Sequence, residues 1–439
     1  MKIERIDLWH VDVPLPAPFH PAWIPGFVQT GNRFTLIRLT TASGLQGWSA
    51  APAIAHERDG LGELLGPYLL GERADDLPAI QQRIREMSYL GSRNGWIEPA
   101  CWDLIGKATG VPVYALLGAS AGTLRLYAST GEMRSAAARA EEVKARLDEG
   151  FQAVKLRVHA ATVDQDIAHA RELRARVGDG PELSIDANQG WRVAVVAEAP
   201  CWSLERATKF CAAAAELGYA WVEEPLAFDA YGELAALRRR SQIPIAGGEL
   251  NNQGLPELTV MLERGCYDIY QPDAVMTGGI AQSVEFMRRV EAAKLRYTPH
   301  TWTNGIGFAI NMQVFAASRF RHSERLEYPC APPGWIPAVR DALLERPWTH
   351  ERGVLELPVE PGLGFSIDRL ALARYGKRFF KATPARVAVR TLLDKGLGAA
   401  RELGNVRERR LAERSERLDA ELRDRTPAQL GLRAAMRSS

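Results

Sequence analysis

The sequence predicts an α/β protein built around a modified TIM-type (β/α)7β barrel, with a separate α+β region in front of it. Three observations predict this fold. After about residue 124, eight short apolar runs alternate with amphipathic helical stretches, a pattern typical of parallel strands joined by helices. Eight is also the number of strands that closes such a barrel. The first 120 residues, in contrast, contain no strand–helix repeat.

The opening region, residues 1–120, combines strands with a group of helices. Residues 3–13 and 34–50 have the alternating apolar pattern of strands. Residues 14–32 between them are rich in Pro and aromatic side chains, which favours a loop. Residues 60–118 are predicted to be helical. We therefore expect an α+β domain here.

Residues 121–340 are predicted to form the barrel itself. Its strands are expected at 124–129, 152–158, 182–187, 220–224, 243–249, 267–273, 295–300 and 324–329. Amphipathic helices fill the gaps between these runs, and parallel pairing requires such crossovers. The last run lacks an obvious helix after it, which favours a (β/α)7β arrangement over a regular barrel.

Two segments follow the barrel. Residues 341–380 include a strand-and-turn stretch at 353–371, and we expect them to return to the first domain. Residues 381–439 form a charged extension rich in Arg, Glu and Ala, predicted to be helical. Leu411, Leu418 and Leu422 fall on one helical face. A solvated tail helix is the favoured interpretation, with a partner-binding helix as the alternative.

Composition excludes several classes of partner. Lys and Arg number 55 against 53 Asp and Glu, a net charge of +2 that argues against nucleic acid. No stretch of 18 apolar residues occurs, so no membrane partner is expected. The 5 cysteines are odd in number and lack a C-x-x-C motif, which favours free thiols in a reducing compartment. With no signal-like apolar run at the start, we expect a cytoplasmic protein.

Ionisable residues end one predicted barrel strand after another. They are Lys155, Asp186, Glu223, Glu249, Asp273, His300 and Glu327. Successive positions lie roughly 24 to 37 residues apart, which is about one βα unit. An acid at a strand end can also cap the next helix. A whole series in register instead predicts one shared site, because the C-terminal ends of barrel strands line the active site.

Three consecutive carboxylates in this series predict a divalent-cation site. Asp186, Glu223 and Glu249 would repel one another without a counter-ion. An all-oxygen ligand set with open positions suits Mg²⁺, and the absence of Cys or His among the three disfavours zinc. A substrate carboxylate held there could lose its α-proton, because the resulting enediolate would be stabilised by the cation.

His300 is the predicted base for that proton, and Asp273 on the preceding strand is expected to orient it. Lys155 and Arg157 lie two apart and face the same side of their strand. They could neutralise the substrate's charge or pair with the metal carboxylates. Lys155 could also act as an acid or base if Arg157 lowered its pKa. Glu327, when protonated, could exchange hydrogen bonds with the substrate carboxylate.

Motifs across residues 1–375 resemble the enolase superfamily, in its mandelate racemase and muconate lactonizing enzyme branch. They are ACWDLIGKATGVPVYALLG (100–118), AVKLR (153–157), SIDANQGW (184–191), WVEEP (221–225), AGGE (246–249), QPDAVMTGGI (271–280), PHTW (299–302) and LEY (326–328). The resemblance implies that the α+β domain caps the barrel, and that the protein is a homo-oligomer. It also implies Mg²⁺ on the three carboxylates and a His300–Asp273 base. The family's second K-x-K lysine, usually the base on the opposite face, is Arg157 here.

That departure shapes the predicted reaction, because arginine is a poor base at neutral pH. A racemase needs a base on each face, whereas a dehydratase can use His300 alone. We therefore expect a protein that resembles the acid-sugar dehydratases of this branch, which convert a 2,3-dihydroxy acid to a 2-keto-3-deoxy acid. A racemase, epimerase or cycloisomerase of the same superfamily is the alternative. A non-catalytic barrel scaffold is disfavoured by the complete set of acids and the His300–Asp273 pair.

The expected partner is a small carboxylate, bound partly by the loop at 14–32. His20 and Trp23 are the loop's predicted substrate-binding residues, with Asn188 and Trp302 at the barrel rim. The aromatic side chains of the loop favour a less hydroxylated acid, and hence an isomerase. Simple packing between the domains explains them equally well.

Overall fold

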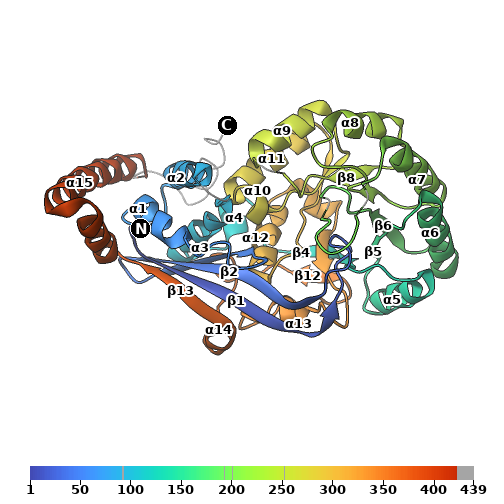
Figure 1. Ribbon diagram of the computed structural model, residues 1–439, viewed down its shortest axis with the longest axis horizontal. Coiled ribbons are helices and arrows are strands. Elements are labelled where there is room, and N and C mark those ends of the chain that lie inside the picture. The colour runs from blue at the N-terminus through green and yellow to red at the C-terminus, as the bar shows by residue number, and fades with distance from the viewer. Residues whose placement is uncertain (91–92, 192, 200, 252, 423–439) are drawn as a thin grey trace.

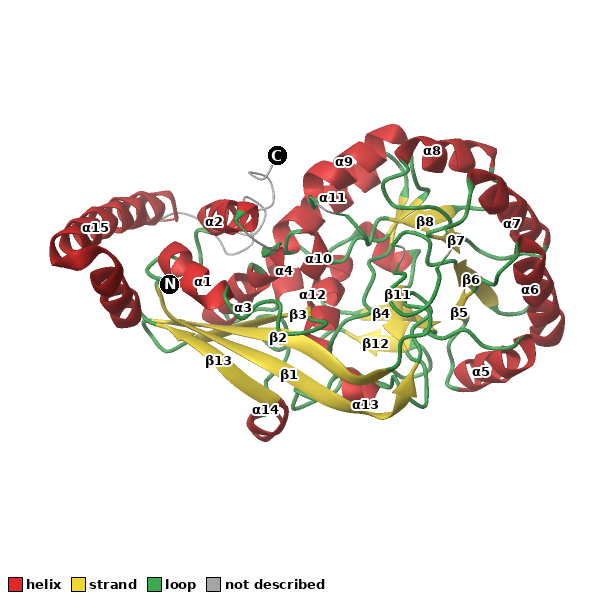
Figure 2. Ribbon diagram, viewed as in Figure 1, coloured by secondary structure: helices red, strands yellow, loops and turns green. Residues whose placement is uncertain are grey.

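The computed structural model describes residues 1–90, 93–191, 193–199, 201–251 and 253–422 (Figure 1). Two sheets organise it, an antiparallel sheet of four strands and a larger, mainly parallel sheet. Helices surround the parallel sheet, and a second group of helices lies on the antiparallel one (Figure 2). The expected α+β domain and modified barrel are therefore confirmed. Among the described residues, no helix combines the length and apolar character needed to cross a membrane.

The antiparallel sheet has the strand order β13–β1–β2–β3. Its strands are β1 (Ile3–Phe19), β2 (Gln29–Thr41), β3 (Gln46–Pro52) and β13 (Gly376–Ala382). β1 extends into the segment predicted to be a loop, because Pro14 and Phe19 still pair with β2. The predicted strand at 34–50 is two strands. A turn separates them, closed by a hydrogen bond from Thr41 N to Leu45 O (2.9 Å), with Gly44 at a φ of 84°.

The helices of this domain are α1 (Leu61–Leu69), α2 (Leu77–Tyr89), α3 (Pro99–Thr109) and α4 (Val113–Leu116), with a 3₁₀ turn, η1 (Gly95–Ile97). α3 is tied to the sheet because its buried Asp103 accepts a hydrogen bond from the Trp48 backbone N–H (3.0 Å). The domain is also tied to the barrel. Glu98, buried just before α3, accepts hydrogen bonds from the backbone N–H groups of Ile280 and Ala281 (2.8 and 3.2 Å).

The parallel strands run in the order β10–β9–β8–β7–β6–β5–β4–β11. They are β4 (Thr123–Ser129), β5 (Ala153–Arg157), β6 (Glu182–Asp186), β7 (Val222–Glu223), β8 (Ile245–Gly247), β9 (Ile269–Tyr270), β10 (Arg296–Tyr297) and β11 (Leu326–Pro329). The last strand returns to pair with the first, because Leu326 lies opposite Leu126 in parallel register. This pairing curls the sheet toward closure.

Helices connect these strands in the expected alternation. They are α5 (Ala136–Asp148), α6 (Val163–Val177), α7 (Leu204–Glu216), α8 (Tyr231–Arg240), α9 (Leu255–Arg264), α10 (Ala274–Thr277), α11 (Ile280–Ala292) and α12 (Gly305–Ala316), with a 3₁₀ turn, η2 (Arg319–His322). After β11 the chain forms a single turn, α13 (Pro337–Arg340), and then β12 (Val354–Glu356), which pairs antiparallel with β4. The eighth strand thus has no full helix of its own, as predicted.

A small apolar cluster forms the floor inside the barrel. It consists of Tyr127 of β4, Ala153 of β5, Trp221 just before β7, Ala246 of β8 and Ile269 of β9. Side chains two residues apart on a strand face the same side. The inward positions after Ala153 and Trp221 are therefore Lys155 and Glu223. Polar groups consequently stand directly above an apolar floor.

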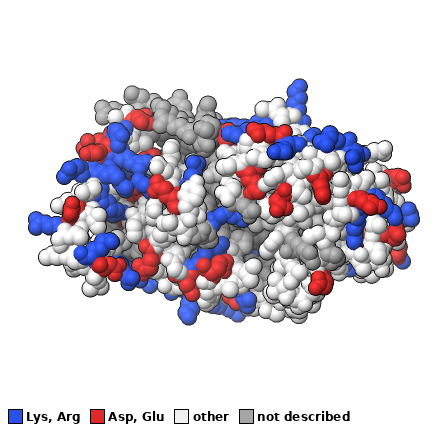
Figure 3. Space-filling model, turned by 45° about the horizontal axis from the view of Figure 1, so that its top comes forward, with Lys and Arg blue, Asp and Glu red and all other residues white. Residues whose placement is uncertain are grey.

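The chain then leaves the barrel through α14 (Arg369–Tyr375), and β13 adds to the first sheet beside β1. The extension is a helix, α15 (Pro384–Leu422), broken at Gly396. It is not a purely solvated tail, because Arg410 and Arg414 bind Glu72 and Asp76 of the first domain (2.8 and 2.9 Å). Figure 3 shows Lys and Arg side chains gathered at this end of the molecule. Residues 423–439 of the predicted extension lie outside the described residues.

Candidate active site

Lys155 stands at the centre of the barrel mouth and is almost completely buried. Its ammonium lies 2.5 Å from Glu223 Oε1, 2.8 Å from Glu327 Oε1 and 3.8 Å from Asp186 Oδ2. Burial lowers the pKa of Lys155, but the charges of Glu223 and Glu327 outweigh it, so the pKa lies well above its ordinary value. The lowering of this pKa by Arg157 that the sequence suggested therefore does not prevail, and Lys155 is a cation.

Arg157, two residues further along β5, is equally buried and held by several partners. It forms a salt bridge with Asp186, and its Nε donates to the Thr130 carbonyl (2.7 Å). Its Nη1 also donates to Asn188 Oδ1 (3.3 Å). The guanidinium lies 5.5 and 5.7 Å from the ring centres of Trp23 and Trp302. Arg157 thus positions carboxylate and aromatic groups and offers no lone pair to accept a proton.

The three predicted metal ligands follow adjacent strands. Asp186 and Glu223 are direct partners in the β6–β7 register, and Glu249 follows the end of β8 at Gly247. Burial and the neighbouring Glu223 and Glu249 charges raise the pKa of Asp186 to about 7, despite the opposing effect of Arg157. Burial also raises the pKa of Glu249. This region therefore holds more negative charge than its cations neutralise.

His300 and Asp273 form the pair expected from their strand-end positions. His300 Nδ1 lies 3.0 Å from Asp273 Oδ2, and Asn311 Nδ2 donates to Asp273 Oδ1 (2.8 Å). The other ring nitrogen, Nε2, lies 3.4 Å from Glu249 Oε2. Burial lowers the pKa of His300, but Glu249 and Asp273 outweigh it and raise this pKa to about 9. The carboxylate contacts thus make the imidazole a stronger base than a free one.

Glu327, at the end of the last strand, is held as an ion. Its Oε2 accepts a hydrogen bond from the Thr301 backbone N–H (2.6 Å). Burial raises the pKa of Glu327, but Lys155 and His300 bring it down to about 2. The protonated form suggested by the sequence is therefore disfavoured. Glu327 serves here as a charge partner of Lys155.

A cavity of about 440 Å³ opens above this cluster. Arg157, Glu249 and His300 line it, as do three of the four predicted substrate-binding residues, Trp23, Asn188 and Trp302. His20, the fourth, is exposed, and the structure does not bring it to the cavity. The remaining wall is largely apolar, and includes Ile24, Phe27, Ile54, Trp191, Val193, Val195, Leu250, Met276 and Trp335.

Comparison with known families identifies the family to which this site belongs. Residues 138–371 match the family described as enolase C-terminal domain-like. Residues 5–118 match the mandelate racemase/muconate lactonizing enzyme N-terminal domain. The chain belongs to this branch of the enolase superfamily. Its acids and its His300–Asp273 pair therefore lie in the mouth of an enolase-superfamily barrel.

Relatives within the enolase superfamily carry out several reactions. The chain is 26% identical over 402 residues to a D-galactarolactone cycloisomerase of Agrobacterium fabrum, covering 85% of this chain and 99% of the relative. It is 26% identical to an arabinonate dehydratase of Saccharolobus solfataricus, covering 70% and 79% of the two chains. A Streptomyces coelicolor racemase, solved with bound magnesium, shares the fold with a TM-score of 0.72 and 22% identity, covering 85% of this chain and 100% of the racemase.

The donor set fits the hard divalent cation expected of an enolase-superfamily site. Six buried or half-buried acids gather here, and within the described part of the chain their cationic partners are Lys155, Arg157 and His300. The acids are Asp186, Glu223, Glu224, Glu249, Asp273 and Glu327. The ligand atoms of Asp186, Glu223 and Glu249 do not form a group within 4.8 Å of one another among the described residues. Shared ligation therefore requires a side-chain adjustment. Glu249 is the one of the three that lines the cavity.

Glu224 is one of two site residues that the sequence analysis missed. It has a φ of 45°, lines the cavity, and its buried Oε1 has no hydrogen-bond partner. Gly190 makes this possible, because a Cβ there would lie 2.3 Å from that oxygen. Burial and the charges of Glu249 and Asp186 raise the pKa of Glu224 well above its ordinary value. The paired acids of the WVEEP motif were the available signal.

Gln271 was also missed, although it lies just after β9 and two residues before Asp273. Its Nε2 donates to Glu223 Oε2 (2.8 Å) and so helps to fix the orientation of that carboxylate. The QPD motif contained it, but an amide offers no charge to draw attention in a sequence.

Proposed function

We propose that this enzyme is a Mg²⁺-dependent lyase that dehydrates a 2,3-dihydroxy acid to a 2-keto-3-deoxy acid. The observation that carries the proposal is the asymmetry of bases at the mouth. His300 is paired with Asp273, whereas the position of the family's second lysine holds Arg157 in a salt bridge with Asp186. One competent base suits an elimination better than an inversion.

Asp186, Glu223 and Glu249 would hold the cation, whose charge would stabilise the substrate carboxylate as it gains electron density. The magnesium reported with the S. coelicolor racemase, which shares this fold, agrees with that choice of ion. Lys155 lies within 4 Å of two of these acids and adds positive charge close by. Arg157 and Asn188 border the cavity, where they can orient the carboxylate.

His300 is placed to move the proton. Its Nδ1 is held by Asp273, and its Nε2 faces Glu249 Oε2 at 3.4 Å. Once Glu249 turned away to hold the cation, Nε2 would be free to take the proton from the substrate α-carbon. The C–H electron pair then becomes part of an enediolate anion. The same imidazolium can donate its proton to the 3-hydroxyl, which leaves as water. The resulting enol tautomerises to the 2-keto product, and the imidazole is again neutral.

A racemase, epimerase or cycloisomerase reaction is the second candidate, and the cavity wall favours it. Trp23, Trp191 and Trp302 with several aliphatic side chains make this wall more apolar than a polyol would need. The similarity to the A. fabrum cycloisomerase, which covers 85% of this chain, also supports an isomerase. Both candidates begin with removal of an α-proton, and they differ in whether water leaves.

A panel of aldonates, aldarates and less hydroxylated acids, supplied with Mg²⁺ in deuterium oxide, separates the two candidates. A trapped 2-keto product supports dehydration. Deuterium at the α-carbon with inversion or ring closure, and without loss of water, would overturn dehydration in favour of the second candidate. The His300→Asn variant is run in parallel, and turnover that survives in it would show that another residue is the base.

A further inference from the structure

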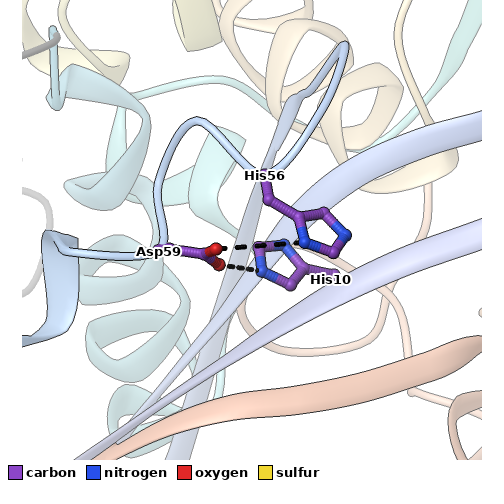
Figure 4. A group of neighbouring side chains, drawn as sticks. All are labelled: His10, His56 and Asp59. Carbon is purple, nitrogen blue, oxygen red and sulfur yellow. Dashed lines mark hydrogen bonds and ion pairs between the residues drawn. The ribbon is translucent and has the colours of Figure 1, made fainter.

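A second cluster of metal-ligating side chains lies outside the barrel mouth. His10 is on β1, while His56 and Asp59 are in the loop between β3 and α1 (Figure 4). His10 Nε2 lies 2.5 Å from Asp59 Oδ1, and His56 Nδ1 lies 3.9 Å from Asp59 Oδ2. The side chains thus point toward one another across elements far apart in the sequence. No step of the proposed reaction uses them.

The surroundings hold His10 in place. Its ring stacks on Phe379 of β13 at 3.9 Å, with an interplanar angle of 10°. On its other face lies the His56 ring, at 4.0 Å and 2°. The His10 side chain is only 12% exposed, whereas those of His56 and Asp59 are 66% and 61% exposed. One ligand is therefore fixed by packing, and two remain open to solvent and free to adjust.

We propose that His10, His56 and Asp59 bind a borderline transition-metal ion of the Zn²⁺ class. One ligand atom from each lies within 4.8 Å of the other two, and among the described residues this is the group of three that meets that distance. Two imidazoles and one carboxylate suit zinc, with water in the fourth position, and are a poor set for Mg²⁺. Stacked rings direct their lone pairs in parallel, so the exposed His56 must tilt when the ion binds.

Such a site would act on the cavity through one loop. Ile54 and Glu57 of this loop line the cavity, while His56 and Asp59 of the same loop face His10. Arg58 already anchors the loop, because its Nη1 donates to Thr35 Oγ1 and to the Pro52 carbonyl (3.2 and 2.9 Å). An ion shared by His10, His56 and Asp59 would add a second anchor. Its occupancy would therefore fix one wall of the cavity.

Zinc titration in saturating Mg²⁺ tests the proposal, since Mg²⁺ keeps the barrel site occupied. The wild-type protein should bind one additional Zn²⁺ per chain in competition with a chromophoric chelator. His56→Ala and Asp59→Asn should each weaken this binding at least about tenfold. The matched control is His322→Ala, which removes an exposed histidine elsewhere and should leave zinc binding unchanged. Melting curves in EDTA confirm that each variant is folded.

Hydrogen exchange provides an independent measurement. Zinc should slow exchange of the backbone amides of residues 53–60 in the wild type and in His322→Ala, and should not do so in Asp59→Asn. Zinc binding that is equal in all four proteins, or absent from the wild type, would overturn the proposal. Binding that leaves exchange of this loop unchanged would overturn its link to the cavity.

Discussion

Two regions of the molecule bury carboxylates in opposite ways. In the antiparallel sheet, a single acid, Asp7, is completely buried and meets three guanidinium groups. Arg5 and Arg38 donate to it at 2.7 to 2.8 Å, and Arg378 lies at 3.4 Å. At the barrel mouth six acids share Lys155, Arg157 and His300. The first cluster has more cations than acids, and the second has more acids than cations.

This difference separates a structural charge cluster from a functional one. Burial acts to raise the pKa of Asp7, but its arginines outweigh it, so this pKa lies below its ordinary value. At the mouth, burial raises the pKa of Asp186 to about 7 and raises that of Glu224 well above its ordinary value. A pKa shift is a statement about stability. Ionised Asp7 therefore stabilises the fold, whereas Asp186 and Glu224 are retained at a cost in stability.

Metal removal should have the largest effect, and it should act on the mouth and leave the Asp7 cluster unchanged. EDTA is expected to abolish turnover, and added Mg²⁺ should restore it. Mg²⁺ should also raise the melting temperature, since an ion that binds only the folded chain stabilises it by mass action. Calorimetry with and without Mg²⁺ measures this shift. Full activity after exhaustive chelation would contradict the assignment of the surplus acids to a cation.

Loss of the base should come next. His300→Asn is expected to lower kcat by about 10²- to 10⁴-fold, because it removes proton transfer at the α-carbon. Exchange of the substrate α-proton with deuterium oxide should fall in parallel. His322→Asn, a change at an exposed histidine, is the control and should leave both rates unchanged. Comparable losses in the two variants would point to a general effect of substitution.

A substitution in the Asp7 cluster should lower the stability of the fold. Asp7→Asn is expected to lower the free energy of unfolding by about 2 kcal/mol near pH 7, because it removes charge-assisted hydrogen bonds. Since the folded pKa of Asp7 is depressed, the wild type's advantage is complete above the unfolded pKa of about 4 and is lost as the pH falls through the folded pKa. Denaturant unfolding at several pH values measures it. A difference between the two proteins that stays constant down to pH 3 would contradict this account.

The smallest expected effect is a gain in stability, opposite in sign to that of Asp7→Asn. Glu224→Gln is expected to stabilise the metal-free protein by about 1 kcal/mol, because it removes a surplus acid without changing the side-chain volume. The same melting experiments as for Asp7→Asn compare the two changes directly. If Glu224→Gln destabilised the metal-free chain as much as Asp7→Asn does, the distinction between the two clusters would fail.

The barrel and its series of strand-end residues could be predicted because strand spacing and side-chain alternation are local properties of the sequence. The positions of Asp186, Glu223 and Asp273 at strand ends needed only the length of one βα unit. Their neighbours could not be predicted in the same way. Glu224 enters the cavity because its φ is 45° and Gly190 leaves space, and both conditions depend on the folded backbone.

Contacts between residues far apart in the sequence also could not be predicted. The continuation of β1 to Phe19 depends on β2 lying beside it, since its prolines alone favour a loop. The contact of His10 with His56 depends on how the loop after β3 folds back over the sheet. The protonation of Lys155 likewise depends on the balance between Glu223, Glu327 and Arg157, which a sequence does not give.

The apolar floor beneath the ionisable residues has a consequence for how such an enzyme can diversify. Ala153 and Trp221 belong to the apolar floor, while Lys155 and Glu223, two positions later, form an ion pair at the barrel mouth. Substitutions in the upper layer can thus alter chemistry without leaving a hole in the layer that holds the strands together. The residues that set the activity and those that maintain the scaffold are then different, so the activity can change during evolution while the scaffold is conserved.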